Sequence, residues 1–126
     1  MTKSKLPALS PAETEILALV WKLGQATVQN VCDHLPDHRR ITYPTVQTLL
    51  RRLEKKGYLD HQSNGKAYLY HSAIRKDDVI RRTVGDFVER LFGGDPVPLL
   101  LHLAQRGDIS PEDIERLKNL VNKTNP

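Results

Sequence analysis

Residues 42–59, TYPTVQTLLRRLEKKGYL, constrain the fold more than any other stretch, because a helical pattern here runs directly into strand-like residues. Placed on a helical wheel, the large aliphatic residues fall within one narrow arc: Val46, Leu49, Leu50 and Leu53. This pattern predicts a helix from Thr42 to Lys56 that buries one face, with Thr42 as its N-cap and Gly57 as its terminator.

A β-hairpin is predicted to follow this helix at once. Tyr58, Leu59 and residues 67–71 are strand-like, and the Asn64-Gly65 dipeptide between them is typical of a type I′ turn, which needs two residues with positive φ. A helix that continues into a hairpin is the arrangement of recognition helix and wing in a winged helix-turn-helix domain.

Two helices are predicted before this unit. Ser10 and Glu13 form a capping box that starts the first helix, and Gly24 ends it. A short second helix follows Thr27 and stops at Pro36. The connection to the third helix is short, as a helix-turn-helix requires.

The pattern changes from Arg75 onward. Three further helices are predicted: an amphipathic one ending at Gly93-Gly94, one that is apolar nearly all round and therefore expected to be buried, and an amphipathic one after Ser110. The predicted fold class is mainly α with a small β-hairpin wing. A winged helix-turn-helix domain would occupy residues 1–74, and a three-helix segment residues 75–126.

Length, cysteine content and charge narrow the class of protein. The 126 residues suit one compact domain, or a small domain with an association segment. A single cysteine, Cys32, no apolar run long enough for a bilayer and no secretory segment predict a cytoplasmic protein. Residues 1–75 carry 11 Lys and Arg against 6 Asp and Glu, and residues 76–126 carry 8 against 9. A basic excess confined to one part suggests a polyanion partner, although charge alone does not distinguish it from a solvated helix face.

The outward face of the 42–56 helix carries residue types suited to double-stranded DNA. Gln can pair with adenine, a Thr methyl can contact thymine, and Arg can pair with guanine in the major groove. The predicted base-reading residues are Pro44, Thr45, Gln47, Thr48 and Arg51. A merely solvated helix more often mixes Glu and Lys at i, i+4 spacing, so this face favours the DNA hypothesis.

Basic and polar residues around this face are expected to contact the phosphate backbone. The predicted phosphate and wing contacts are Arg39, Arg40, Thr42, Arg52, Lys55, Lys56, Lys66 and Tyr68. Arg39 and Arg40 could equally be residues that keep a loop soluble. Tyr68, taken alone, is expected more often to pack against the core than to reach DNA.

No catalytic or metal-binding pattern stands out. The chain has five His but no HExxH, GxSxG, phosphate-loop or paired-Cys motif, so neither an enzyme nor a cofactor or metal site is expected. Cys32, His34 and His38 are close in sequence. Cys32 lies on a predicted apolar face, where a small buried side chain is expected rather than a ligand.

Three stretches resemble the penicillinase-repressor family of bacterial winged-helix repressors (BlaI/MecI/CopY): LSPAETEILALVWKLGQATVQNV, TYPTVQTLLRRLEKKGYLDHQSNGKAYLYHSAI and GDISPEDIERLKNLV. They cover nearly the whole chain in the family's order. The specific part is T-V-x-T-L-L-x-R-L-x-K-K-G followed by a wing that ends in Y-x-Y. The resemblance implies a homodimeric repressor that binds a palindromic operator and blocks transcription.

The resemblance also implies that the three C-terminal helices form the dimer interface, which agrees with their apolar stripes. The expected interface residues are Ile80, Val84, Phe87, Val88, Leu91, Leu99, Leu100, Leu103, Leu117, Leu120 and Val121. The alternative is that these stripes pack within one chain. Short helices around an all-apolar middle one favour burial between chains.

The resemblance offers three modes of regulation. The copper-sensing branch uses several C-terminal cysteines, which this chain lacks. The β-lactam-responsive branch is cleaved at an Asn-Phe bond by a regulatory protease. The corresponding pair here is His102-Leu103, and neither residue matches, which argues against the same protease. A third, large branch has no known signal, and this chain could belong to it.

Two other protein classes remain as alternatives. A ligand-sensing MarR-like regulator builds its dimer from helices at both chain ends, and little chain precedes Ser10 here. A winged helix that binds protein would not need the basic face or the groove-suited Thr and Gln side chains. Binding that weakens steeply as salt rises would distinguish DNA from a protein partner.

Overall fold

The structure, a computed structural model, describes residues 6–39 and 41–124. Its contacts divide the chain into a unit ending at Arg81 and a unit beginning at Arg82. The division lies inside α4 (Lys76–Phe92), because the first turn of that helix packs on the N-terminal unit. Val79 is only 3% exposed there. A boundary after residue 74 stays a prediction.

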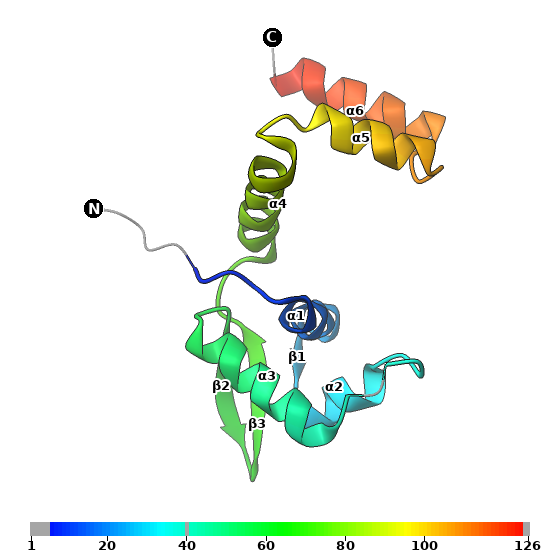
Figure 1. Ribbon diagram of the computed structural model, residues 1–126. Helices are drawn as coiled ribbons and strands as arrows, with labels where there is room; N and C mark the ends of the chain where they lie inside the picture. Colours follow the sequence, from blue (N-terminus) through cyan, green and yellow to red (C-terminus); the bar gives the residue numbers. More distant parts are fainter. Residues whose placement is uncertain (1–5, 40, 125–126) are drawn as a thin grey trace, which may run out of the picture. The chain divides into compact units, whose positions relative to one another are not determined.

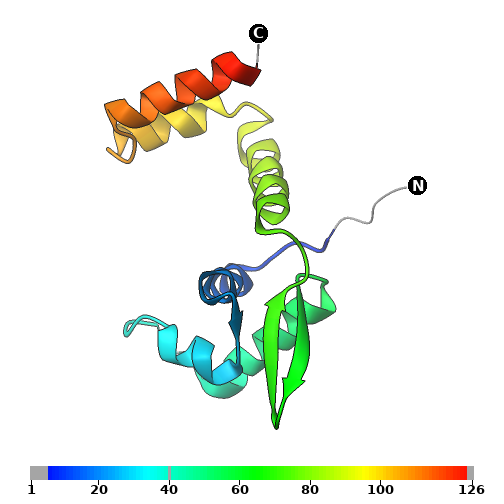
Figure 2. The ribbon, with the colours of Figure 1, turned by 180° about the vertical axis from the view of Figure 1, so that it is seen from behind.

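The N-terminal unit is a three-helix bundle with a small antiparallel sheet, and the predicted fold class is confirmed (Figures 1 and 2). Its elements in chain order are α1 (Pro11–Leu23), β1 (Gln25–Ala26), α2 (Val28–His34), α3 (Tyr43–Lys55), β2 (Leu59–Asn64) and β3 (Ala67–Ser72). Helices α1 and α2 both pack against α3, and β2 with β3 forms the hairpin that follows it.

The predicted helix starts of α1 and α2 are confirmed as capping boxes. In α1 the Ser10 hydroxyl accepts from the Glu13 amide at 3.1 Å, while the Glu13 carboxylate accepts from the Ser10 amide at 2.8 Å. In α2 the Thr27 hydroxyl and the Asn30 side chain make the same reciprocal pair. Gly24 ends α1 with φ of 85°, a left-handed conformation that favours glycine.

The sheet contains one strand that the sequence did not predict. β1 has two residues, pairs with β3 at Gln25↔His71 and Ala26↔Tyr70, and places β3 in the centre of the order β1-β3-β2. Two residues are too few to show a period in sequence. Ala26 is fully buried, so β1 closes the base of the hairpin against the bundle.

The predicted type I′ turn at Asn64-Gly65 is wrong. Asn64 pairs with Ala67, so the two turn residues are Gly65 and Lys66. Gly65 has φ of 67°, and among the residues the structure describes only glycines have positive φ. One positive φ at the first turn residue fits type II′, which asks for glycine at that place. Lys66 is thereby located at the hairpin tip.

One hydrophobic core holds the N-terminal unit together. The buried apolar residues come from the three helices, the sheet, the link between α3 and β2, and the first turn of α4: Ile16, Leu17, Val20, Ala26, Val28, Val31, Val46, Leu49, Leu50, Leu53, Tyr58, Leu59, Tyr70 and Val79. The α3 residues in this set are the four that the helical wheel placed inward. The orientation of α3 predicted from sequence is therefore confirmed.

The C-terminal unit consists of the rest of α4, α5 (Val97–Gln105) and α6 (Pro111–Thr124). Ser110 and Asp113 form the predicted capping box of α6. Neither α5 nor α6 has a buried residue, so the prediction that α5 is buried is not met within one chain. No helix in the described part of the chain has both the length and the apolarity to cross a membrane.

Candidate nucleic-acid interface

The outer face of α3 presents the side chains predicted to read bases. Pro44, Thr45, Thr48 and Arg51 are exposed, and Gln47 is half-buried at the edge of the face. The buried arc opposite them fixes this orientation, because turning α3 would expose four aliphatic residues. The fold therefore turns the predicted reading face to solvent.

The threonine hydroxyls on this face are engaged within the helix. Thr48 donates to the carbonyl of Pro44 at 3.0 Å, and the hydroxyls of Thr42 and Thr45 lie 3.0 Å apart. Thr42 occupies the N-cap position as predicted, but its side chain makes no cap hydrogen bond. The Thr45 and Thr48 methyls, and the first-turn amides without a side-chain cap, remain available to a ligand.

One flank of α3 is tied to the start of α1 through a buried carboxylate. Glu13 is 1% exposed, and Lys56 Nζ lies 2.6 Å from its Oε1. The same Nζ donates to the carbonyl of Ala8 at 2.8 Å, and Arg52 Nε lies 3.9 Å from Glu13 Oε2. Burial raises the pKa of Glu13, but hydrogen bonds from Lys56 and Ser10 and the charge of Lys56 outweigh it and lower the pKa below its ordinary value.

This arrangement gives Lys56 a structural role that the sequence did not reveal. Lys56 was predicted as a phosphate contact, and Glu13 only as a capping residue. They are separated by 43 positions, so no local pattern joins them. The Lys56 side chain is 23% exposed. The neighbouring Lys55 is exposed and makes no ion pair within the described residues.

Arg39 is also engaged with a carboxylate of α1. Its Nε and guanidinium nitrogen contact Glu15 at 2.9 and 2.6 Å, a two-pronged ion pair. The hydrogen bonds to Glu15 and then its charge raise the pKa of Arg39. Arg40, its predicted companion, lies outside the described residues.

The wing tip is solvent-exposed, as a DNA contact requires. Lys66 is exposed, and Tyr68 is 45% exposed. The expectation that Tyr68 packs against the core is wrong, because its ring stacks on His61 instead, with centroids 3.9 Å apart and planes at 13°. The Tyr68 ring therefore lies over a neighbouring wing residue with part of its surface open.

Sequence reasoning missed Tyr43. It is the first residue of α3, is 47% exposed and stands immediately before Pro44. An exposed aromatic residue at the start of a recognition helix can contact a thymine methyl with its ring or a phosphate with its hydroxyl. The available signal was an aromatic residue outside the apolar arc.

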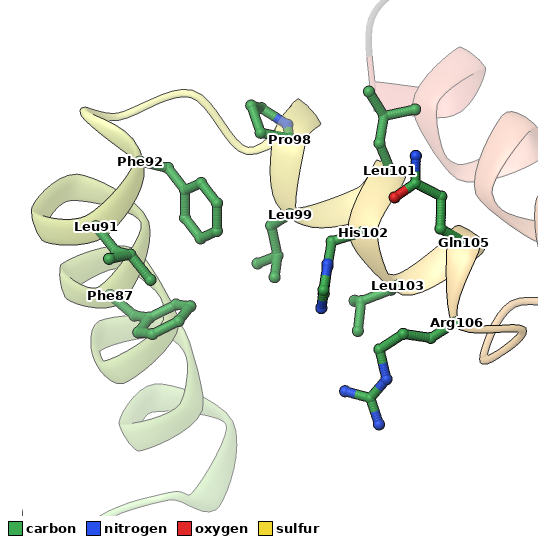
Figure 3. A pocket seen from close by; sticks show the side chains of 10 residues that line it. All are labelled: Phe87, Leu91, Phe92, Pro98, Leu99, Leu101, His102, Leu103, Gln105 and Arg106. Atoms are coloured by element: carbon green, nitrogen blue, oxygen red, sulfur yellow. The ribbon is translucent and has the colours of Figure 1, made fainter.

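The predicted dimer residues belong to the C-terminal unit, except for Ile80, which lies just before it. Of these residues Leu91, Leu120 and Val121 are more than half exposed, and so is Leu101, which was not predicted. Side chains of α4 and α5 face one another across an open hollow of about 720 Å³, which has Phe87, Leu99 and Leu103 on its walls (Figure 3). His102, of the predicted cleavage pair, is exposed and lines the same hollow.

No grouping of three or more His, Cys, Asp or Glu that could hold a metal ion occurs within residues 6–39 and 41–124. Cys32 is half-buried against the core. Burial, and then the charge of Asp33, raise the pKa of its thiol, which disfavours the thiolate that metal binding needs.

Comparison with known proteins gives a consistent result. The family model described as Penicillinase repressor matches residues 9–123. The chain is 29% identical over 120 residues to the methicillin resistance regulatory protein MecI of Mammaliicoccus sciuri, covering 95% of this chain and 98% of MecI. It is 29% identical over 117 residues to the penicillinase repressor of Bacillus licheniformis, covering 93% and 91%.

A solved structure from the same family is also similar. The monomeric form of Bacillus licheniformis BlaI in complex with the blaP half-operator superposes with a TM-score of 0.50 at 34% identity. The match covers 59% of this chain and 90% of that one.

Proposed function

The chain belongs to the penicillinase repressor family of DNA-binding transcriptional repressors, and from this we propose that it represses transcription as a homodimer on a palindromic operator. The protein would act in the cytoplasm, where bacterial DNA lies. The two recognition helices would enter successive major grooves about 34–36 Å apart, since the dimer axis imposes this spacing.

The observation that carries the proposal is the outward face of α3. Five predicted readers lie on this face or at its edge, and the apolar arc behind them is fully packed. In the proposed complex Thr45, Gln47, Thr48 and Arg51 contact base edges. Tyr43 is added to them because of its exposure at the start of the helix.

The phosphate contacts fall into two groups. Lys55 and Lys66 are exposed and unpaired by acids within the described residues, so we assign the main backbone contacts to them. Arg39, Arg52 and Lys56 also interact with glutamates, so their share is smaller. Arg39 can reach a phosphate only by giving up part of its pair with Glu15.

The dimer is supported by the surface of the C-terminal unit. All the fully buried apolar residues within the described parts of the chain lie at or before Val79, while the apolar stripes of α4, α5 and α6 remain exposed. Monomeric proteins rarely leave such a surface uncovered. We therefore propose that a second copy covers it.

Relatives of this chain are named for methicillin resistance and penicillinase repression. We propose to identify the gene that this repressor controls from the sequence of its operator rather than from the names of its relatives. At the position where the β-lactam-responsive relatives are cleaved at an Asn-Phe bond, this chain has His102-Leu103. The residues at this position therefore argue against relief of repression by the same protease.

The experiment that tests the function is selection of bound duplexes from a random pool at two salt concentrations. We expect a two-fold palindrome to be enriched, and binding to weaken steeply with salt through counterion release. Salt-sensitive binding without an enriched motif would indicate a general DNA coater. Retention of no duplex at either salt would favour the protein-binding alternative.

Replacing Gln47 by alanine is expected to relax the preference at one base pair of each half-site and to cost about 1–3 kcal/mol of binding. Lys55→Ala is the matched comparison: it should weaken all duplexes alike and lower the salt slope by about 1. Both are measured by titrating matched and mismatched operators. An unchanged base preference in Gln47→Ala would remove Gln47 from the readers.

A further inference from the structure

A hydrogen bond joins the recognition helix to the wing. His61 Nδ1 on β2 lies 2.8 Å from both carboxylate oxygens of Glu54 on α3. Both side chains are partly sheltered, at 27% and 29% exposure. Glu54 follows the base-reading part of α3, and His61 is the third residue of β2, so the contact spans the two elements proposed to touch DNA.

The ring of His61 continues this contact along the wing. His61 and Tyr70 are direct partners across β2 and β3, and Tyr68 lies on the same face two residues along. His61 stacks on Tyr68, while its ring lies 5.7 Å from Tyr70 at a tilt of 55°. Tyr70 is 1% exposed, so this face of the wing is anchored in the core at its base.

The base-reading Arg51 is part of the same neighbourhood. Burial raises the pKa of Tyr70, the negative charge of Glu54 adds to this, and Arg51 opposes it by its charge and a hydrogen bond. Arg51 and Glu54 therefore both act on Tyr70 through their charges.

The wing needs an external support. Its base is held by β1, which pairs with β3 only at Tyr70 and His71. Beyond this the hairpin is a two-stranded ribbon, and such a ribbon is marginally stable by itself. Contacts with α3, among them the Glu54–His61 hydrogen bond, therefore help to set the direction of its tip and the place of Lys66.

We infer that Glu54 and His61 are positioning residues, which fix the wing against the recognition helix so that Lys66 and Tyr68 meet the DNA backbone in register with the readers of α3. This rests on the proposed function for its effect on DNA. The fixation of the wing itself is a property of the free protein.

The first test needs no DNA. Glu54→Ala removes the acceptor, Glu54→Gln keeps an oxygen acceptor, and Asp60→Ala removes a neighbouring exposed carboxylate that makes no ion pair within the described residues. Amide hydrogen exchange at residues 62–67 should speed up about five- to tenfold in Glu54→Ala. It should stay near the wild-type rate in the other two variants.

The second test uses the selected operator. In the wild type, Lys66→Ala should lower affinity and reduce the salt slope by about 1. In the Glu54→Ala background the same change should cost much less, because the tip is already displaced. Asp60→Ala should leave the effect of Lys66→Ala intact, which separates positioning from the mere loss of a negative charge near DNA.

The melting temperature of every variant is measured first. If Glu54→Ala does not fold, His61→Phe replaces it, since phenylalanine keeps the stack on Tyr68 and removes the hydrogen bond. The inference would be overturned if Lys66→Ala lowered operator affinity equally in the wild type and in Glu54→Ala. It would also be overturned if Glu54→Ala left the amide hydrogen exchange of residues 62–67 unchanged. A wild-type protein that selects no operator would refute the proposed function instead, while the exchange result still decides whether Glu54 holds the wing.

Discussion

Replacing Lys56 by alanine is expected to lower the free energy of unfolding by about 3 kcal/mol and the melting temperature by roughly 10 °C or more. Glu13 would keep its buried position but lose the ammonium group 2.6 Å away. Removing one partner of a buried ion pair leaves an uncompensated charge, which is costlier than the pair's own net contribution. Arg52, at 3.9 Å, compensates only in part.

The neighbouring Lys55→Ala is the matched control, because it removes the same charge from the same turn without a buried partner. Its stability in urea should remain within about 0.5 kcal/mol of the wild type. The two substitutions should thus have different main effects: Lys56→Ala should lower the stability of the fold, and Lys55→Ala should lower the affinity for DNA. Equal unfolding curves for both variants would show that the Glu13 pair contributes nothing.

Acid provides a second check on the same pair. The pKa of Glu13 is lowered in the folded protein, so its contribution to stability is present above the ordinary glutamate pKa and is lost as pH falls through the lower folded value. The stability gap between wild type and Lys56→Ala should therefore narrow in acid. Urea unfolding at pH 7 and below about pH 4 measures this.

The second large effect is expected at Leu120. This side chain is 61% exposed in the single chain and lies on the proposed dimer surface. Leu120→Asp should leave the chain folded but place an unpaired carboxylate in the interface twice, once per protomer. We expect dimer affinity to fall at least a hundredfold, an effect of about 3 kcal/mol or more. Affinity for the full palindrome should fall with it.

Asn119→Asp supplies the control, since it adds the same charge to α6 on the side away from the stripe of Leu117, Leu120 and Val121. Light scattering after gel filtration gives the oligomeric state, and titrations compare full and half operators. Half-operator binding by Leu120→Asp should resemble that of the wild type. A dimer that persists in Leu120→Asp would move the interface away from α6.

Periodic and local features were predictable from the sequence. The four inward residues of α3 repeat with the helical period, and the pairs Ser10 with Glu13 and Ser110 with Asp113 lie three residues apart. Each is read from neighbours on the chain. The hairpin was located by the same kind of signal, although its turn type was not.

Features that depend on distant pairs were not predictable. The Glu13–Lys56 and Glu15–Arg39 pairs join residues 43 and 24 positions apart, and they exist only once the helices are packed. A lysine in a basic run looks the same whether it will contact phosphate or a buried carboxylate. Of the two adjacent lysines at the end of α3, the fold alone pairs Lys56 with the buried Glu13.

The lack of buried residues in α5 and α6 has a consequence for how the concentration of this repressor controls the gene that it represses. On the proposed dimer, these helices acquire their buried side chains only when two chains meet, because within one chain neither holds a buried residue. Occupancy of the operator would then rise with the square of the monomer concentration when monomers are scarce. At concentrations too low for dimers to form, newly made chains would expose apolar helices to cellular proteases. Degradation would then remove the monomers, so operator occupancy would rise even more steeply with the amount of repressor.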